Sequence, residues 1–269
     1  VARMIFYMAV RYEGELGDEV DLEIINDAIE DKSSKPDHKF LMPLRSKFFP
    51  GAYYFHDLAF IDGELYANSV GQNGVVKVDM NNSATDDLFW QIELEKYSKE
   101  KLTEANYIQL NSIATGKTFE ESFFSASLAK PSKYRPGHAK FPIDGSGVIF
   151  NSKSEVVGTG LTRPHSARVH NGEIWVNNSG YGEIGKIVDG KYEAQYKLPG
   201  WTRGLKFIGD YAITGYSVVL KKYTNYAPGI DYTKAKCGIA IINTKTNQIE
   251  GSIEFPFGNQ IFQIETINS

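Results

Sequence analysis

The sequence has only one cysteine, Cys237, in 269 residues. A disulfide within the chain and a cysteine-based zinc site are therefore both excluded. Cys237 stands in the apolar run 237–242, where a lone thiol is usually a small core residue rather than a nucleophile. The near-absence of cysteine indicates a reducing, cytoplasmic location.

Long hydrophobic runs and a surplus of basic residues are also missing. No stretch approaches the roughly 20 apolar residues of a membrane span. The apolar start, residues 1–10, lacks the basic region and the small-residue cleavage site of a signal peptide. The formal net charge of -4 argues against nucleic-acid binding, which needs clustered Lys and Arg. We therefore expect a soluble protein that binds neither nucleic acid nor membrane.

Aromatic residues and glycine are abundant: 16 Tyr, 16 Phe and 25 Gly. This mixture favours strands joined by tight turns. A helical pattern is confined to a short charged stretch at 93–104, and the Ser-, Lys-, Pro- and Gly-rich segment 115–146 is expected to be one long insertion loop. The sequence therefore predicts a single all-β domain over residues 1–269.

An internal repeat organises the chain. In its clearest copies an apolar strand, a Gly-bearing turn and a second strand follow one another, as at 56–68, 165–178 and 203–215. Weaker copies begin at Phe6, Asn111 and Phe262. Successive copies start 38 to 59 residues apart, which suits one four-stranded blade each, so we predict a six-bladed β-propeller.

Closure of this ring is expected to be incomplete. The last copy begins at Phe262 and the sequence stops at Ser269, so the final blade lacks closing strands. The first residue is Val1 rather than Met, and we expect the missing strands to belong to a longer protein.

Several short motifs resemble a known family. They are His-Asp-Leu-Ala at 56–59, Leu-Asn-Ser at 110–112, Pro-His-Ser-Ala-Arg at 164–168 and Arg-Gly-Leu at 203–205. On these motifs the chain is similar to a bacterial family of conserved hypothetical proteins, a domain of unknown function. The resemblance implies a propeller and supplies no reaction, so the site has to be argued from the residues.

The first residues of the copies should form a ring around the central channel, since equivalent positions of a propeller's inner strands surround its axis. This ring would have one polar wall and one apolar wall, as small-molecule pockets usually do. Its members are Phe6, His56, Asn111, His165, Arg203 and Phe262. The residues that follow three of them, Asp57, Ser112 and Ser166, are expected to orient the imidazoles.

These residue types point to an anionic small molecule as the ligand. Imidazoles suit acid–base catalysis near pH 7, so His56 and His165 are the predicted catalytic residues. Arg203 would hold a carboxylate or phosphate through its bidentate fork. The predicted substrate-binding residues are Asn111, Arg203, Phe6, Phe262, Asp57 and Ser166.

No cofactor is expected. Two histidines and an asparagine supply only two strong metal ligands, so no metal site is predicted, although a divalent ion stays open as an alternative. Nothing in the sequence resembles a nicotinamide, flavin or haem site.

Structural alternatives exist for each of these residues. A histidine at a strand start often only links neighbouring blades. Arg163 and Arg168 flank His165 and would reinforce an anion site, but lone charges are more often on the surface. Trp201 would form a lid over the pocket or pack between blades.

Three functions are compatible with this pattern. The first is an enzyme of hydrolase, lyase or isomerase type that acts on an anionic metabolite. The second is a binding module without turnover, and the third is a protein-interaction scaffold. The sequence alone does not decide among them, and it specifies neither the substrate nor the oligomeric state.

Overall fold

The computed structural model describes residues 53–79, 88–94, 97–103, 105–138, 140–256 and 258–265. All of these residues belong to one structural unit, Phe48–Ser269. Phe6 lies outside the described residues. The prediction of a single domain over 1–269 therefore stays a prediction.

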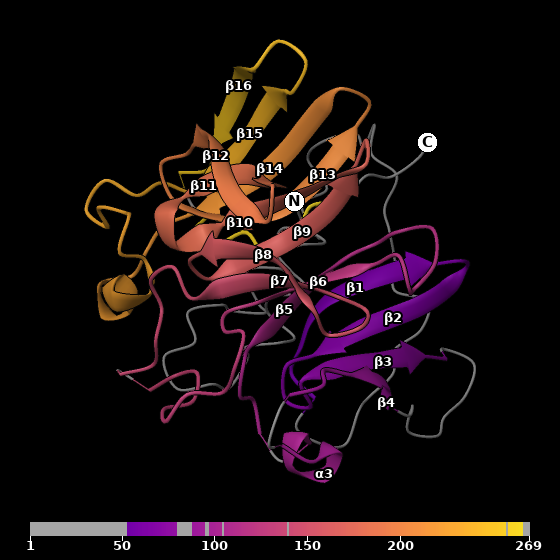
Figure 1. Ribbon diagram of the computed structural model, residues 1–269. Helices are drawn as coiled ribbons and strands as arrows, with labels where there is room; N and C mark the ends of the chain where they lie inside the picture. The colour runs from indigo at the N-terminus through magenta and orange to yellow at the C-terminus, as the bar shows by residue number, and fades with distance from the viewer. Residues whose placement is uncertain are drawn as a thin grey trace, which may run out of the picture. The chain divides into compact units, whose positions relative to one another are not determined.

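The described strands form consecutive four-stranded groups, or blades, in chain order (Figure 1). The first blade holds β1 (Phe55–Ile61), β2 (Glu64–Ser69), β3 (Gly74–Val78) and β4 (Leu88–Gln91). The second holds β5 (Leu110–Ala114), β6 (Phe123–Ala126), β7 (Gly147–Asn151) and β8 (Val156–Leu161). The third holds β9 (Pro164–His170), β10 (Glu173–Asn178), β11 (Glu183–Val188) and β12 (Lys191–Lys197). The fourth holds β13 (Trp201–Ile208), β14 (Tyr211–Ser217), β15 (Gly238–Asn243) and β16 (Gln248–Glu254).

Neighbouring strands within each blade pair antiparallel, and one parallel contact, Lys191 with Thr159, joins the second and third blades at β12 and β8. The first strands of successive blades also contact one another, β1 with β5, β5 with β9 and β9 with β13. This succession of four-stranded antiparallel blades is a β-propeller, as the sequence predicts. The described residues contain four blades, and the count of six stays a prediction.

The hairpin turns between first and second strands follow their sequence signals. Asp62 and Gly63 have φ of 48° and 77°, and Asn171 and Gly172 have φ of 51° and 78°. Positive φ at both central residues is the type I′ geometry that Asp-Gly and Asn-Gly pairs favour. These turns fix the register of the blades that carry His56 and His165.

Three local predictions need correction or refinement. The segment 115–146 is not one loop, because β6 lies inside it at Phe123–Ala126. Phe262 does not begin a strand, since the described residues 261–265 contain none. The predicted helix at 93–104 is real but short: α3 spans Lys99–Leu102, with the Ser98 hydroxyl accepting from the Lys101 N–H.

Each blade's first strand has a break in its pairing register at the position of the predicted ring, in β1 and β5, or directly after it, in β9 and β13. In β1 the register shifts between Phe55 and Asp57, around His56. In β5 it shifts between Leu110 and Ser112, around Asn111. Comparable shifts interrupt the pairing of β9 with β10 and of β13 with β14. Such bulges interrupt the regular alternation of side chains and re-aim them, often beside functional sites.

Apolar side chains fill the spaces within and between blades. One cluster joins the first two blades and includes Ile61, Ile113 and Phe124. Another joins the third and fourth blades around Trp175 and Leu205. Cys237 is buried and burial raises the pKa of its thiol, so its predicted role as a core residue is confirmed.

Among the helices of the described residues, none has the length and apolar character needed to cross a membrane.

Candidate functional site

The four polar residues of the predicted ring all lie near the start of a first strand: His56 in β1, Asn111 in β5, His165 in β9 and Arg203 in β13. His56 Nδ1 lies 3.2 Å from Asn111 Oδ1. The Asn111 amide in turn donates to the Pro164 carbonyl at 2.9 Å. Hydrogen bonds therefore connect the first three blades at this level.

A pocket of about 450 Å³ opens beside the third and fourth blades. His165, Arg203 and Phe262 line it, together with Arg163, Trp201 and Tyr226. His56 and Asn111 are not among its described lining residues. The structure thus brings His165 and Arg203 into one pocket, while His56 lies outside its described wall.

His165 is held by two oxygen atoms and is almost fully buried. Its Nδ1 lies 2.9 Å from both the Arg163 carbonyl and the Ser179 hydroxyl. Since the Ser179 hydroxyl donates its own proton to the Thr202 carbonyl at 2.6 Å, Nδ1 must be the donor to both oxygens. The proton therefore sits on Nδ1, and Nε2 keeps a lone pair.

The charge state of His165 follows from its surroundings. Burial lowers the pKa of its imidazole well below the ordinary value, and the neighbouring charges of Arg203 and His56 lower it further. The ring is consequently neutral near pH 7. A neutral imidazole with an anchored Nδ1 offers Nε2 as a proton acceptor.

Arg163 is the most unusual residue of the pocket. It is 1% exposed, so the expectation that it lies on the surface is wrong. Its Nη1 donates to the side-chain oxygen of Gln109, and the Tyr226 side chain is a second polar neighbour of the guanidinium. Nε and Nη2 make no hydrogen bond of 3.5 Å or shorter to the described residues. Burial lowers the pKa of Arg163 to about 10, partly offset by Tyr226, so the guanidinium still carries its charge at neutral pH.

Aromatic rings surround the charged groups of the pocket. The guanidinium carbon of Arg163 lies 4.8 Å from the ring centre of Phe141 and 4.3 Å from that of Tyr226. The guanidinium of Arg203 lies 4.9 Å from the Phe262 ring. Trp201 lies beside the His165 ring, with 5.6 Å between ring centres. The pocket wall is therefore cationic and aromatic, and its described residues include no Asp or Glu.

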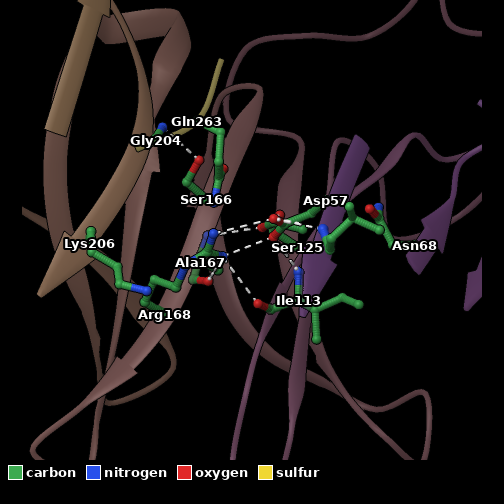
Figure 2. Close-up of polar contacts among 12 residues, drawn as sticks. Asp57, Asn68, Ile113, Ser125, Ser166, Ala167, Arg168, Gly204, Lys206 and Gln263 are labelled. Carbon is green, nitrogen blue, oxygen red and sulfur yellow. Dashed lines mark hydrogen bonds and ion pairs between the residues drawn. The ribbon is translucent and has the colours of Figure 1, made fainter. Parts of the chain in front are cut away.

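Asp57, Ser112 and Ser166 bind the next blade instead of orienting the His165 ring. Ser112 accepts from the Ala167 N–H, and Ser166 from the Gly204 N–H, both at 2.9 Å. Figure 2 shows Ser166 facing Gly204 from the neighbouring strand. Gly204 itself has φ of 75° and a close approach to the Ile264 backbone, which only glycine tolerates.

Asp57 makes the same kind of contact and adds an ion pair (Figure 2). Its carboxylate accepts from the Ile113 N–H at 3.0 Å and from the Arg168 guanidinium at 2.8 and 3.2 Å. Burial alone would lower the pKa of Arg168, but the Asp57 carboxylate more than offsets this and raises it. We call the bonds made by Asp57, Ser112 and Ser166 the inter-blade bonds, and they join the first strands of all four described blades.

A metal site has little support in the described part of the chain. No group of three or more His, Cys, Asp or Glu side chains gathers there in a way that would hold an ion. The predicted absence of a cofactor stays a prediction.

The sequence predicts neither the burial of Arg163 nor the roles of three further residues, Gln109, Ser179 and Tyr226. Arg163 is adjacent to the Pro-His motif, where the sequence indicates only a flanking charge. Its burial depends on Phe141 and Tyr226, which are distant in the sequence and carry no local signal that links them to Arg163.

The fold defines the class of the protein as a β-propeller with a cationic, aromatic pocket. Residues 15–269 match the family model DUF4915, a domain of unknown function, and the chain belongs to this family. A search of curated proteins gives no match.

Solved structures with the same general fold are distant. The WD40 β-propeller domain of Doa1 is 13% identical, with a TM-score of 0.40 over 77% of this chain and 70% of that chain. Glutaminyl cyclase from Myxococcus xanthus is 9% identical, with a TM-score of 0.40 over 77% of this chain and 73% of that chain. No function is transferred from proteins this distant.

Proposed function

We propose that this propeller binds a small anionic organic molecule in the pocket lined by Arg163, His165 and Arg203. The observation that carries the proposal is the charge of the wall: two arginines and a neutral histidine line it, and its described residues include no carboxylate. Arginine binds carboxylate and phosphate groups through charge-assisted hydrogen bonds.

The size and the apolar part of the pocket support the same proposal. Small-ligand sites commonly occupy about 300–1,000 Å³ and combine apolar walls with a few polar groups. At about 450 Å³, with Trp201, Tyr223 and Phe262 in its wall, this pocket suits a molecule that has both an anionic group and an apolar body.

Catalysis by His165 is a second candidate function, and the state of its ring favours it. A general base must be unprotonated at working pH and within reach of its substrate. The lowered pKa and the anchored Nδ1 of His165 meet the first condition, and its place in the pocket wall meets the second. A hydrolase, lyase or isomerase step on the bound anion is compatible with this arrangement, with His165 rather than the predicted pair His56 and His165 as the base.

A thermal-shift screen of the purified protein against carboxylates, phosphate esters and divalent metal ions tests the binding proposal. A ligand at 100 times its Kd adds about 2.7 kcal/mol to the free energy of unfolding, a shift of roughly 5–10 °C here. The shift should vanish in His165→Ala and Arg203→Ala. It should persist in the matched controls His170→Ala and Lys206→Ala, which change half-buried positions of the same two strands outside the described pocket lining.

The possible outcomes separate the functions. A hit that is lost only in the pocket variants supports binding, and turnover that falls by roughly 10²–10⁴ in His165→Ala supports catalysis. Failure of every anion to shift the folded protein would contradict both, and would favour a protein-interaction scaffold.

The number of blades, the cellular location and the source of the protein are also proposals. The count of six blades is supported by the spacing of the repeat copies in the sequence, 38 to 59 residues, although no strand begins at Phe262. A cytoplasmic location is supported by the near-absence of cysteine. A bacterial origin is supported by the motifs at 164–168 and 203–205.

A further inference from the structure

We infer that the ligand carries a planar carboxylate, which binds side-on to the Nε and Nη2 atoms of Arg163 while the rest of the molecule occupies the pocket. This inference rests on the proposed function and specifies its ligand class. It starts from Arg163, a buried arginine of the pocket with Nε and Nη2 unpaired among the described residues.

The guanidinium of Arg163 is held at one end. Nη1 donates to the side-chain oxygen of Gln109, and the same oxygen accepts from the Ser127 hydroxyl at 3.0 Å, which fixes Gln109 in turn. Nε–H and one N–H of Nη2 lie together on one edge of the guanidinium and point the same way. Two parallel donors on a planar edge match the two oxygens of a carboxylate.

The surroundings of this edge favour a flat group. The rings of Phe141 and Tyr226 lie close to the guanidinium carbon, at 4.8 and 4.3 Å. A carboxylate bound in the guanidinium plane avoids a ring that lies over the face of the guanidinium, as rings do in cation–π contacts. A tetrahedral phosphate would direct oxygens out of that plane, toward the space beside the rings, so we expect carboxylates to bind more tightly than phosphate esters of the same body.

The energetics require a counter-charge. A buried ion without a partner loses its hydration without compensation, and proteins usually pair such groups. Arg168 on the same strand receives its counter-charge from Asp57. For Arg163 no described residue supplies one, and a ligand carboxylate would complete the pair.

Access to this edge has to come from a local movement, because both nitrogens are buried. Tyr226 ends the short 3₁₀ segment η2 (Lys221–Tyr226), none of whose residues is buried. Its residues are exposed or half-buried, and a small displacement of the segment would open the edge of Arg163.

Isothermal titration calorimetry with matched probes tests this inference. The probes are benzoate, phenylacetate and indole-3-acetate, each compared with the phosphate monoester of the same ring system. Carboxylates should bind more tightly than their partners. Arg163→Lys keeps the charge but loses the planar edge, so it should weaken carboxylate binding by about 10- to 100-fold and phosphate binding much less.

A second variant keeps the test independent of the probes. Arg163→Met removes a buried charge and retains most of the side-chain volume, while Gln109 keeps its bond to Ser127. If Arg163 serves the ligand, the melting temperature of the ligand-free protein should stay the same or rise. A drop of several degrees would show a structural role and overturn the inference.

The outcomes also separate this inference from the proposed function. Tighter binding of the phosphate esters, no detectable carboxylate binding, or unchanged carboxylate affinity in Arg163→Lys would overturn the inference. The proposed function would survive any of these results if another anion binds and Arg203→Ala abolishes its binding. If no anion binds at all, both fail.

Discussion

Arg163 and Arg168 lie on either side of His165, yet their surroundings differ completely. The Arg168 guanidinium, whose side chain is 16% exposed, pairs with Asp57 and donates to the carbonyls of Ile113 and Ala167. The Arg163 guanidinium has one side-chain partner, Gln109, and two donors without any among the described residues. The same residue type thus stabilises the fold at one position and leaves unused binding capacity at the other.

The pKa values of the two arginines shift in opposite directions. Asp57 raises the pKa of Arg168, so folding favours its charged form. Burial lowers the pKa of Arg163 to about 10, so folding disfavours its charged form. A charged group that burial destabilises, in the wall of a pocket, is typical of a functional site.

The largest expected effect comes from breaking the ion pair between Asp57 and Arg168. Asp57→Asn leaves the Arg168 charge uncompensated at the blade junction, and we expect a loss of about 3–5 kcal/mol in the free energy of unfolding. Urea unfolding measures it. The control Glu64→Gln removes the exposed pair with Lys77 and should cost less than about 1 kcal/mol. Equal effects in both variants would contradict the assigned role of Asp57.

A smaller loss is expected at a neutral inter-blade bond. Ser112→Ala leaves the buried Ala167 N–H without its acceptor, at a cost of about 1–3 kcal/mol. The control Ser152→Ala removes an exposed hydroxyl bond to the Glu120 carbonyl and should change stability by less than about 0.5 kcal/mol. Urea unfolding of the two variants measures both free energies of unfolding. If Ser112→Ala costs no more than Ser152→Ala, the inter-blade bonds do not contribute to stability as proposed.

The smallest expected effect is a pH dependence that belongs to His165. Its folded pKa lies below the unfolded value of about 6.5, so below that pH the unfolded chain binds more protons at this site than the folded protein. His165 therefore destabilises the fold progressively as the pH falls below about 6.5, with a slope of at most about 1.4 kcal/mol per pH unit.

Thermal unfolding between pH 7.5 and 5 would measure this slope. His165→Gln should flatten the curve relative to the wild type, because it removes the imidazole that the folded protein holds neutral. An identical slope in His165→Gln would mean that its imidazole is not held neutral.

The sequence predicts the propeller and much of its inner layer. The Asp62-Gly63 and Asn171-Gly172 turns set the hairpin registers, and the repeat places His56, Asn111, His165 and Arg203 on first strands. Turn residues and repeat spacing are local patterns, so they can be recognised from the sequence alone.

The features that the sequence does not predict depend on contacts between residues that are far apart in the sequence. Regular strand alternation cannot indicate that each first strand has a register shift, which lets Ser112 and Ser166 reach the next blade. A lone arginine is normally expected at the surface, and the burial of Arg163 depends on Tyr226 and Phe141. The pairing of Asp57 with Arg168 likewise joins separate blades.

The most direct measurement of the central claim compares the melting temperatures of ligand-free Arg163→Met and Arg168→Met with that of the wild type. We expect Arg168→Met to melt at a lower temperature than the wild type, because it leaves the Asp57 carboxylate buried without its partner. The corresponding loss in the free energy of unfolding should be about 3–5 kcal/mol. We expect Arg163→Met to melt at the same temperature as the wild type or higher, because it removes an uncompensated charge. Comparable destabilisation by the two substitutions would contradict the account, since it would make Arg163 a structural residue like Arg168.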